Sequence, residues 1–274
     1  MSRLTFRRKV DVCWQKQLRD QHLSLGTPDV PHLDVGRSVV RRVSYRLAKQ
    51  IILQYEWLGT MAATGHHFGI FFGDFCAGVT CIAAGGGTGS VNGHKLFRIR
   101  RNEFGTLARG ACVHWSPVGT NSRLVAWTCR LLRRSTSLKL LIAYADTDAG
   151  EIGTIYQACN WVYIGKGSAT RQWVSPEGRV HDQKLPYNLK LQKGGTRAGW
   201  CKALRAKGWR EQESNPKYRY VYVIDKRDKS LLRLVETMRR PYPKRQLAGV
   251  VLDGSTLADQ ASSGGSIPTR PLRR

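Results

Sequence analysis

Short apolar runs alternate with amphipathic segments through the middle of the chain. The apolar runs, bounded by turn-forming residues, predict strands at 37–43, 68–72, 77–84, 107–115, 138–144 and 218–224. Apolar side chains at helical spacing predict helices at 44–54 and 119–134, and Ser44 is placed to cap the first of them. This order of strands and helices predicts a mixed sheet with helices on its faces.

The most informative segment is 144–165, where an apolar strand runs into a polar turn. Asp146, Asp148 and Glu151 lie in this turn, and Tyr156 lies on the short helix that follows. Polar groups at the end of a buried strand are typical of a site in an α/β protein. A second corner, at 115–123, joins the strand predicted at 107–115 to the second predicted helix. The corners at 115–123 and 144–156 are the ends of consecutive strands, so we expect them to open on the same side of the sheet.

The amino-acid composition is strongly basic. The chain has 45 Lys and Arg against 19 Asp and Glu, a net charge of +26 and an isoelectric point near 10.4, which favours nucleic acid as a partner. Residues 165–210 hold eleven Lys and Arg against two acids, with Trp and Tyr interleaved. We interpret this stretch as a DNA-facing surface. The plainer interpretation is a solvated charged face.

The cysteines and the apolar runs argue against a zinc-binding, secreted or membrane-spanning protein. Seven cysteines are scattered without a C-x-x-C pair, which favours reduced, buried thiols over a zinc site. Neither a secretory signal nor an apolar run of about 20 residues is recognisable. We therefore expect a cytoplasmic protein with no membrane partner.

Three regions are expected from the composition along the chain. Residues 1–36 are polar and basic and are interpreted as an N-terminal arm with one short helix. Residues 37–245 form the predicted domain, with 165–210 as a basic insertion. Residues 246–274 are rich in Ser, Gly and Ala and are predicted to be a disordered tail.

Four blocks of the chain resemble the Mom family of phage DNA-modification proteins. They are Tyr55–Met61 (YEWLGTM), Arg109–Arg123 (RGACVHWSPVGTNSR), Tyr144–Gly165 (YADTDAGEIGTIYQACNWVYIG) and Pro216–Tyr222 (PKYRYVY). The resemblance covers roughly residues 38–245, and its longest block is the most specific one.

The resemblance implies an α/β (α+β) fold similar to GNAT acyltransferases, with a mixed, largely antiparallel sheet flanked by helices. It also implies a transferase that modifies adenine N6 in double-stranded DNA to a carbamoylmethyl-type adduct. Such a modification protects bacteriophage DNA from restriction enzymes. The expected location is the cytoplasm of the bacterial host.

The same resemblance places catalytic residues in the informative segment. Asp146 follows a buried strand, where a carboxylate can act as a base, and Tyr156 occupies the position of a general acid in GNAT-like enzymes. Glu56 lies in the first resembling block and is expected to be a polar site residue. On sequence alone, Asp146 capping the turn and Tyr156 packing in the core remain open.

A donor site is implied at the start of the second predicted helix, where GNAT-like proteins bind a pyrophosphate through backbone N–H groups. The expected binding residues are Gly119, Asn121, Ser122 and Arg123, although their loop differs from the usual Q/R-x-x-G-x-G/A pattern. The alternative is a simple N-cap with a solvated arginine. Acetyl-CoA and a glycine-derived group are both candidates for the donor.

Residues that contact the DNA substrate are expected on both sides of this site. Asn160 could read the adenine edge and Trp161 could stack on a flipped base, whereas an Asn at a helix end is often a C-cap. The full set of expected DNA contacts is Tyr55, Asn160, Trp161, Arg179, His181, Lys184 and Arg197.

Iron is a cofactor candidate that the resemblance brings in. His66 and His67 with Asp146 are the residues that could contribute ligands. Adjacent residues on a strand point to opposite faces, however, so the two histidines do not readily share one ion.

Two other functions remain open at this level. The chain could be an N-acyltransferase that acts on another amine, in RNA or in a small molecule. It could also be a basic nucleic-acid-binding protein without catalytic activity.

Overall fold

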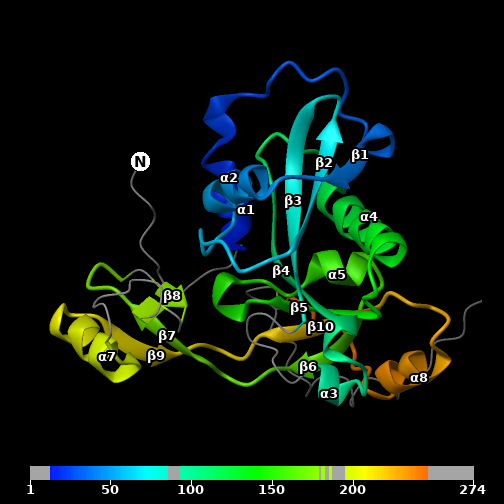
Figure 1. Ribbon diagram of the computed structural model, residues 1–274. Coiled ribbons are helices and arrows are strands. Elements are labelled where there is room, and N and C mark those ends of the chain that lie inside the picture. The colour runs from blue at the N-terminus through cyan, green and yellow to red at the C-terminus, as the bar shows by residue number, and fades with distance from the viewer. Residues whose placement is uncertain (1–12, 86–92, 179, 183–184, 187–194, 246–274) are drawn as a thin grey trace, which may run out of the picture. The chain divides into compact units, whose positions relative to one another are not determined.

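The computed structural model describes residues 13–85, 93–178, 180–182, 185–186 and 195–245. Within these residues the main sheet has seven strands in the spatial order β1-β2-β3-β4-β5-β10-β6 (Figure 1). The strands are β1 (Val39–Arg42), β2 (His66–Phe72), β3 (Phe75–Ala84), β4 (Phe104–Cys112), β5 (Leu140–Ala145), β6 (Val162–Lys166) and β10 (Tyr218–Val223). A smaller sheet has the order β8-β7-β9 and consists of β7 (Arg171–Val174), β8 (Val180–Asp182) and β9 (Arg210–Glu213).

Helices connect these strands. They are α1 (Trp14–Asp20), α2 (Tyr45–Tyr55), α3 (Gly93–Leu96), α4 (Thr120–Ser135), α5 (Thr154–Ala158), α7 (Arg197–Ala206) and α8 (Lys229–Thr237). Short 3-10 turns lie at Leu23–Leu25, Val35–Arg37, Arg101–Glu103 and Thr147–Ala149. None of the helices in the described residues is both long enough and apolar enough to cross a membrane.

The sheet is mixed and largely antiparallel, as expected. Among the described strand pairs, β4 and β5 are parallel, from Phe104 opposite Leu140 to Leu107 opposite Ala143, and the others are antiparallel. Beyond Leu107, β4 pairs only with β3, and a bulge at Ala108 bends it there. The C-terminal halves of β4 and β5 therefore separate in the middle of the sheet.

Helices cover both faces because the strands alternate apolar side chains between them. On β5, Leu141 and Ala143 pack with Val125 and Leu132 of α4. The alternate residues of β5 face the other way and pack with Leu231 of α8. Figure 1 shows α4 and α5 on one side of the sheet and α2 on the other.

Helix α2 forms where its pattern predicts it. The Ser44 hydroxyl accepts a hydrogen bond from the backbone N–H of Leu47 at 3.2 Å, which caps the first turn. Ala48, Ile51, Ile52 and Tyr55 recur at helical spacing and are all buried, so they fix the face that α2 turns to the sheet.

The described part of the predicted N-terminal arm packs against the domain. The Gln15 side chain donates to the Gly110 carbonyl at 2.9 Å, and Arg19 donates to the Ser116 carbonyl at 3.0 Å. Up to Lys244 the described residues form one compact unit. The rest of the arm, at 1–12, and the predicted tail at 246–274 lie outside the described residues.

The strand with the largest shift from its predicted bounds is β4. The strand predicted at 107–115 begins at Phe104, because its first residues pair with β5, and ends at Cys112. His114 therefore lies in a turn and not in a strand. All seven cysteines are free, and four of them are buried, as the scattered pattern predicts.

Candidate active site

Four separate segments bring polar side chains to the place where β4 and β5 separate. Glu56 follows α2, Arg109 lies on β4 beyond the bulge, Asp146 and Glu151 follow β5, and Lys217 precedes β10. Lys217 comes close because β10 runs antiparallel to β5, with Tyr218 opposite Ala145. The polar side chains at this separation form the candidate active site.

Asp146 is held on two sides. Its Oδ1 accepts the backbone N–H of Asp148 at 3.0 Å, and its Oδ2 lies 2.5 Å from Nζ of Lys217. Only 5% of Asp146 is exposed, so this charge-assisted contact with Lys217 is shielded from water. Asp146 therefore caps the turn, as its alternative interpretation predicted, and also anchors Lys217.

Glu151 occupies the centre of the site. Its Oε2 accepts the backbone N–H of Asp146 at 3.2 Å. Burial of the carboxyl group, together with the negative charges of Asp146 and Glu56, raises the pKa of Glu151 to about 8, and the positive charge of Lys217 opposes this rise. A carboxyl with a pKa near 8 exchanges a proton readily at neutral pH.

Glu56 is the second carboxyl of this kind. Its Oε2 accepts the backbone N–H groups of Leu58 at 3.0 Å and Gly59 at 3.1 Å and lies 4.0 Å from Nε of Arg109. Burial raises the pKa of Glu56 to about 7, against the opposing effect of Arg109. Two acids from different segments thus both have raised pKa values, a pattern that is characteristic of acid–base sites.

Tyr156 reaches the same site from α5. Its ring lies 5.1 Å from that of Trp161 and 5.3 Å from that of Tyr220. Burial, followed by the negative charge of Glu151, raises the pKa of Tyr156 well above its usual value. Its hydroxyl has no hydrogen-bond partner among the residues that the structure describes. The phenol is therefore neutral and keeps its proton available.

The α4 N-terminus has some features of a site for the donor's phosphate: an exposed loop and backbone N–H groups that are free within the described residues. Val118 in the preceding loop is fully exposed, and Gly119 adopts a left-handed conformation with φ 89°. In the described part of the chain, no hydrogen bond engages the backbone N–H groups of Asn121 and Ser122. These groups lie at the positive end of a 16-residue helix, where an anion is stabilised.

Arg123, in the first turn of α4, is held in part by backbone carbonyls. Its Nη2 donates to the Gly36 carbonyl at 2.7 Å and to the Ser38 carbonyl at 3.1 Å. The guanidinium therefore ties α4 to the segment before β1. Nη2 is thus engaged by two carbonyls, whereas Nε has no partner in the described residues, and the expected contact of Arg123 with the donor stays a prediction.

The expected DNA contacts near the site are also placed differently. Trp161 is fully buried, so its indole packs the core and has no free face for a base. Asn160 is exposed in a left-handed conformation with φ 56°, just after α5, which is the C-cap arrangement. Tyr55 is buried and its hydroxyl is 2.7 Å from Nδ1 of His114, whose Nε2 is 2.8 Å from the Gly26 carbonyl oxygen, so it connects α2 to the N-terminal segment through His114.

The remaining expected contacts lie in the basic stretch. His181 lies on β8 with its ring 5.0 Å from that of Trp209, and Arg197 is the first residue of α7 and is exposed. Arg179 and Lys184 lie outside the described residues.

The residues named for iron do not form an iron site. His66 and His67 are consecutive on β2, and Nε2 of His67 is 2.8 Å from Oγ1 of Thr64. In the described residues, no three His, Cys, Asp or Glu side chains are grouped so that they could hold a metal ion. These histidines and Asp146 therefore do not fit an iron ion.

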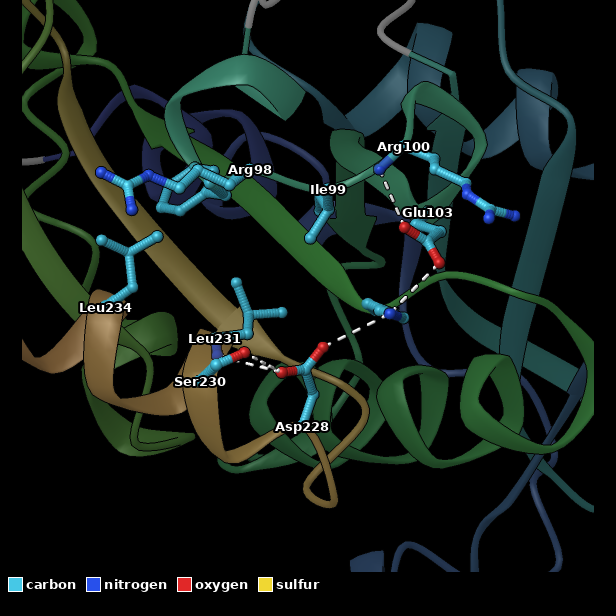
Figure 2. A pocket seen from close by; sticks show the side chains of 10 residues that line it. Arg98, Ile99, Arg100, Glu103, Asp228, Ser230, Leu231 and Leu234 are labelled. Carbon is cyan, nitrogen blue, oxygen red and sulfur yellow. Dashed lines mark hydrogen bonds and ion pairs between the residues drawn. The ribbon is translucent and has the colours of Figure 1, made fainter.

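A separate hollow of about 560 Å³ lies at the opposite end of β5. Figure 2 shows its acids Glu103 and Asp228, which lie on either side of Lys139, at 3.2 Å and 3.3 Å from Nζ. These ion pairs and the cap that Asp228 provides to α8 account for the polar groups here. The hollow is distinct from the candidate active site.

Sequence reasoning misses two central residues of the site. The local pattern indicates only a first-turn residue at Glu151 and gives no role to Lys217. Each lies inside a resembling block, which is the available signal. The pairing of β10 with β5 cannot be deduced from the local pattern, so the approach of Lys217 to Asp146 is visible only in the structure.

Comparison with solved structures finds N-acyl transferring enzymes at low identity. An N-acetyltransferase from Staphylococcus aureus Mu50 is 7% identical with a TM-score of 0.37, over 68% of this chain and 97% of its own. FeeM, an N-acyl amino acid synthase from uncultured soil microbes, is 15% identical with a TM-score of 0.40, over 69% and 92%. AAC(6')-Ib in complex with ribostamycin and coenzyme A is 8% identical with a TM-score of 0.40, over 70% and 97%. A search of curated proteins found no match.

The fold and the site together define the class. A largely antiparallel sheet whose single described parallel pair separates, with helices on both faces, is a mixed α/β fold. Its polar cluster lies at the strand separation. The match to the Mom protein family covers residues 37–244, and the chain belongs to this family.

Proposed function

We propose that this protein is a transferase that modifies adenine N6 in double-stranded DNA with a carbamoylmethyl-type group. The observation that carries the proposal is the convergence of Glu56, Glu151 and Tyr156 at the separation of β4 and β5. Membership of the Mom protein family supports the choice of adenine in phage DNA as the substrate. In that context the modification protects DNA from restriction.

In such a reaction, Glu151 would remove one proton and Tyr156 would supply another. The ionised carboxylate of Glu151 takes the proton from N6 as the bond between N6 and the donor carbon forms. The bond between that carbon and its leaving group breaks, and the leaving group departs with the bonding electrons. Tyr156, which is neutral, gives it a proton. A pKa near 8 suits Glu151 to this task better than Asp146, whose charge is already paired with Lys217.

The donor is proposed to bind over the α4 N-terminus. The free N–H groups of Asn121 and Ser122 suit a phosphate or a carboxylate. Acyl transfer from an acyl-CoA would give an amide at N6, so the carbamoylmethyl product requires a different activated donor, such as a glycine-derived one. The acceptor must leave the base stack, because N6 of a stacked adenine cannot reach buried carboxyl groups.

The proposed function is tested by the mass of the nucleosides in DNA from cells that express the chain. We expect deoxyadenosine with the added mass of a carbamoylmethyl group, and none in DNA from cells that express Glu151→Gln. Unmodified deoxyadenosine in the presence of folded, wild-type protein would reject the proposal. An equivalent adduct found only in RNA or in a small amine would favour the alternative acceptor.

Lys217 provides a prediction about pH. Its positive charge lowers the pKa of both Glu151 and Glu56, so Lys217→Gln removes that effect and both pKa values rise. Because the base acts when ionised, the rising limb of the pH–rate profile is expected to move to higher pH, with a lower rate at pH 7. The profile of Lys229→Gln, which changes an exposed lysine at the start of α8, serves as the control. An unshifted profile in Lys217→Gln would contradict this role.

A further inference from the structure

A group of exposed cations lies on α4 and the two elements beside it. Arg130, Arg133 and Arg134 are exposed on the last turns of α4. Arg42 of β1 donates to the hydroxyl of Ser135 at 2.9 Å, which places it beside the end of α4. Lys226, which follows β10, is also exposed. We call Arg42, Arg130, Arg133, Arg134 and Lys226 the α4 patch.

The arginines of the α4 patch have few acidic neighbours. The acids beside Lys226, Asp225 and Asp228, are paired with Arg227 and Lys139. The sequence has no Asp or Glu between Asp34 and Glu56, or between Glu103 and Asp146, so β1, α2, β4 and α4 all lack acids. None of the ion pairs in the described residues involves a member of the patch. Although Lys226 is exposed, partial desolvation of its ammonium group and the charge of Arg133 lower its pKa. Uncompensated like charges of this kind are stabilised when a polyanion binds.

The patch also contains aromatic surface. The guanidinium of Arg130 lies 4.8 Å from the ring centre of Trp127, and Nζ of Lys226 lies 4.2 Å from that of Tyr222. These rings hold the two cations in place on the protein side. The charged atoms therefore form a positioned row and are not free to disperse into solvent.

Aromatic contacts connect the patch to the candidate active site. The Tyr222 ring lies 5.6 Å from Trp161, and the Trp161 ring lies 5.1 Å from Tyr156. The patch and the proposed general acid are thus two ring contacts apart, on the face of the sheet that α4 and α5 cover. Tyr222 pairs with Leu141, towards the end of β5 that is away from the site, and Trp161 is fully buried, so these contacts run through the core. A polymer bound at the patch therefore extends along the sheet to reach the site.

We propose that the α4 patch binds the phosphate backbone of the duplex DNA that is modified. This inference rests on the proposed function, which supplies DNA as the substrate. It moves the main phosphate contacts from the predicted surface at 165–210 to β1, α4 and the segment after β10.

The distribution of the charges favours a polymer over a single small anion. Arg130 and Arg134 are separated by about 6 Å along the helix axis, at about 1.5 Å per residue. Arg42 and Lys226 extend the row on two other elements. A duplex presents roughly one phosphate per 3.4 Å on each strand, so several phosphates can pair with this row at once.

The basic insertion is less suited to this role in its described part. Arg205 of α7 is paired with Glu211 at 3.1 Å, and β9 ends in Glu213. Its exposed lysines thus share their surface with acids, whereas the arginines of the α4 patch do not. This contrast makes the insertion a suitable control.

The test compares two triple variants that remove the same charge. Arg130→Gln, Arg133→Gln and Arg134→Gln together alter the patch, and Lys202→Gln, Lys207→Gln and Arg210→Gln together alter the insertion. The measurement is the dissociation constant of a DNA duplex as a function of salt concentration. Each lost phosphate contact reduces the slope of log K against log salt by about 0.9, so we expect a reduction of about two to three in the patch variant and less than about one in the insertion variant.

The outcomes separate this inference from the proposed function. A patch variant whose slope falls no more than that of the insertion variant would overturn the inference, while wild-type binding to DNA leaves the proposed function intact. Absence of wild-type binding to duplex DNA, or a preference for single-stranded RNA, would count against both.

The variants are chosen so that folding does not obscure the result. All six residues are exposed, and thermal melts of both variants verify that each is folded. If either triple variant does not fold, the pair Arg133→Gln and Arg134→Gln, against Lys202→Gln and Lys207→Gln, provides the same comparison with an expected difference in slope of about two.

Discussion

Glu151→Gln is expected to lower the rate of adenine modification by about 10²- to 10⁴-fold, the usual contribution of a general base. Glutamine keeps the size of the side chain and can still accept the backbone N–H of Asp146, which Glu151 accepts at 3.2 Å. It cannot take a proton, so chemistry fails while the local structure persists. The measurement is the single-turnover rate of adduct formation on a DNA duplex.

The pH dependence separates a catalytic role of Glu151 from a structural one. In the wild-type protein the rate is expected to rise with pH through about 8, as Glu151 ionises. In Glu151→Gln the remaining rate is expected to lose this limb. Glu213→Gln, at an exposed position on β9, is the control and keeps the wild-type profile. A Glu151→Gln variant within about tenfold of the wild-type rate would contradict the assignment.

The same carboxyl makes a prediction about stability. Its pKa in the folded protein is about 8, above the ordinary value of 4.5. The folded state therefore holds this proton more tightly than the unfolded state, and the resulting stability is fully present below about pH 4.5. It is lost progressively as the pH rises through about 8. We expect the Tm of the wild-type protein to fall more between about pH 5 and pH 8 than that of Glu151→Gln.

The sequence predicts the local elements of this protein better than the contacts between them. Ser44 and the apolar spacing after it identify α2, because an N-cap residue and a row of apolar side chains on one helix face are both local signals. The apolar runs identify β1 to β5 and β10 for the same reason, whereas they do not predict the short strands of the smaller sheet. Sequence patterning does not identify α8, although Leu231 and Val235 bury one of its faces. Its short pattern, nine residues from Lys229 to Thr237, gives a weak periodic signal.

The candidate site shows where local reasoning ends. The resemblance to the family implies that Asp146 and Tyr156 act together, and Asp146 lies where β4 and β5 separate. The acids that affect the Tyr156 phenol are nevertheless Glu151 and Glu56. Which acid pairs with Lys217 depends on the register of β10 against β5, a long-range property that no single segment encodes. The same limitation applies to Arg123, whose partners lie more than eighty residues away.

Gly153→Ala is expected to destabilise the protein by about 3 kcal/mol or more. A Cβ at this position would lie 2.3 Å from Cε2 and 2.6 Å from Cζ of Tyr220. The ring cannot retreat, because Tyr220 is fully buried and its hydroxyl donates to the Ile152 carbonyl and accepts from Gln157. Overpacking of about 1–3 kcal/mol adds to the backbone strain of about 1–2 kcal/mol that a left-handed alanine carries. The Tm is expected to fall by roughly 6–12 °C.

Gly119→Ala separates these two contributions. Gly119 also precedes a helix and also has a positive φ, 89° against 76° for Gly153, but a Cβ there would meet nothing within 4 Å. Only the backbone strain remains, so the expected cost is about 1–2 kcal/mol. Equal losses of Tm in the two variants would show that the Tyr220 ring can move. In that case the α5 segment that carries Tyr156 is less rigidly positioned than its contacts with Tyr220 and Gln157 imply, and the phenol would need the substrate to fix its orientation.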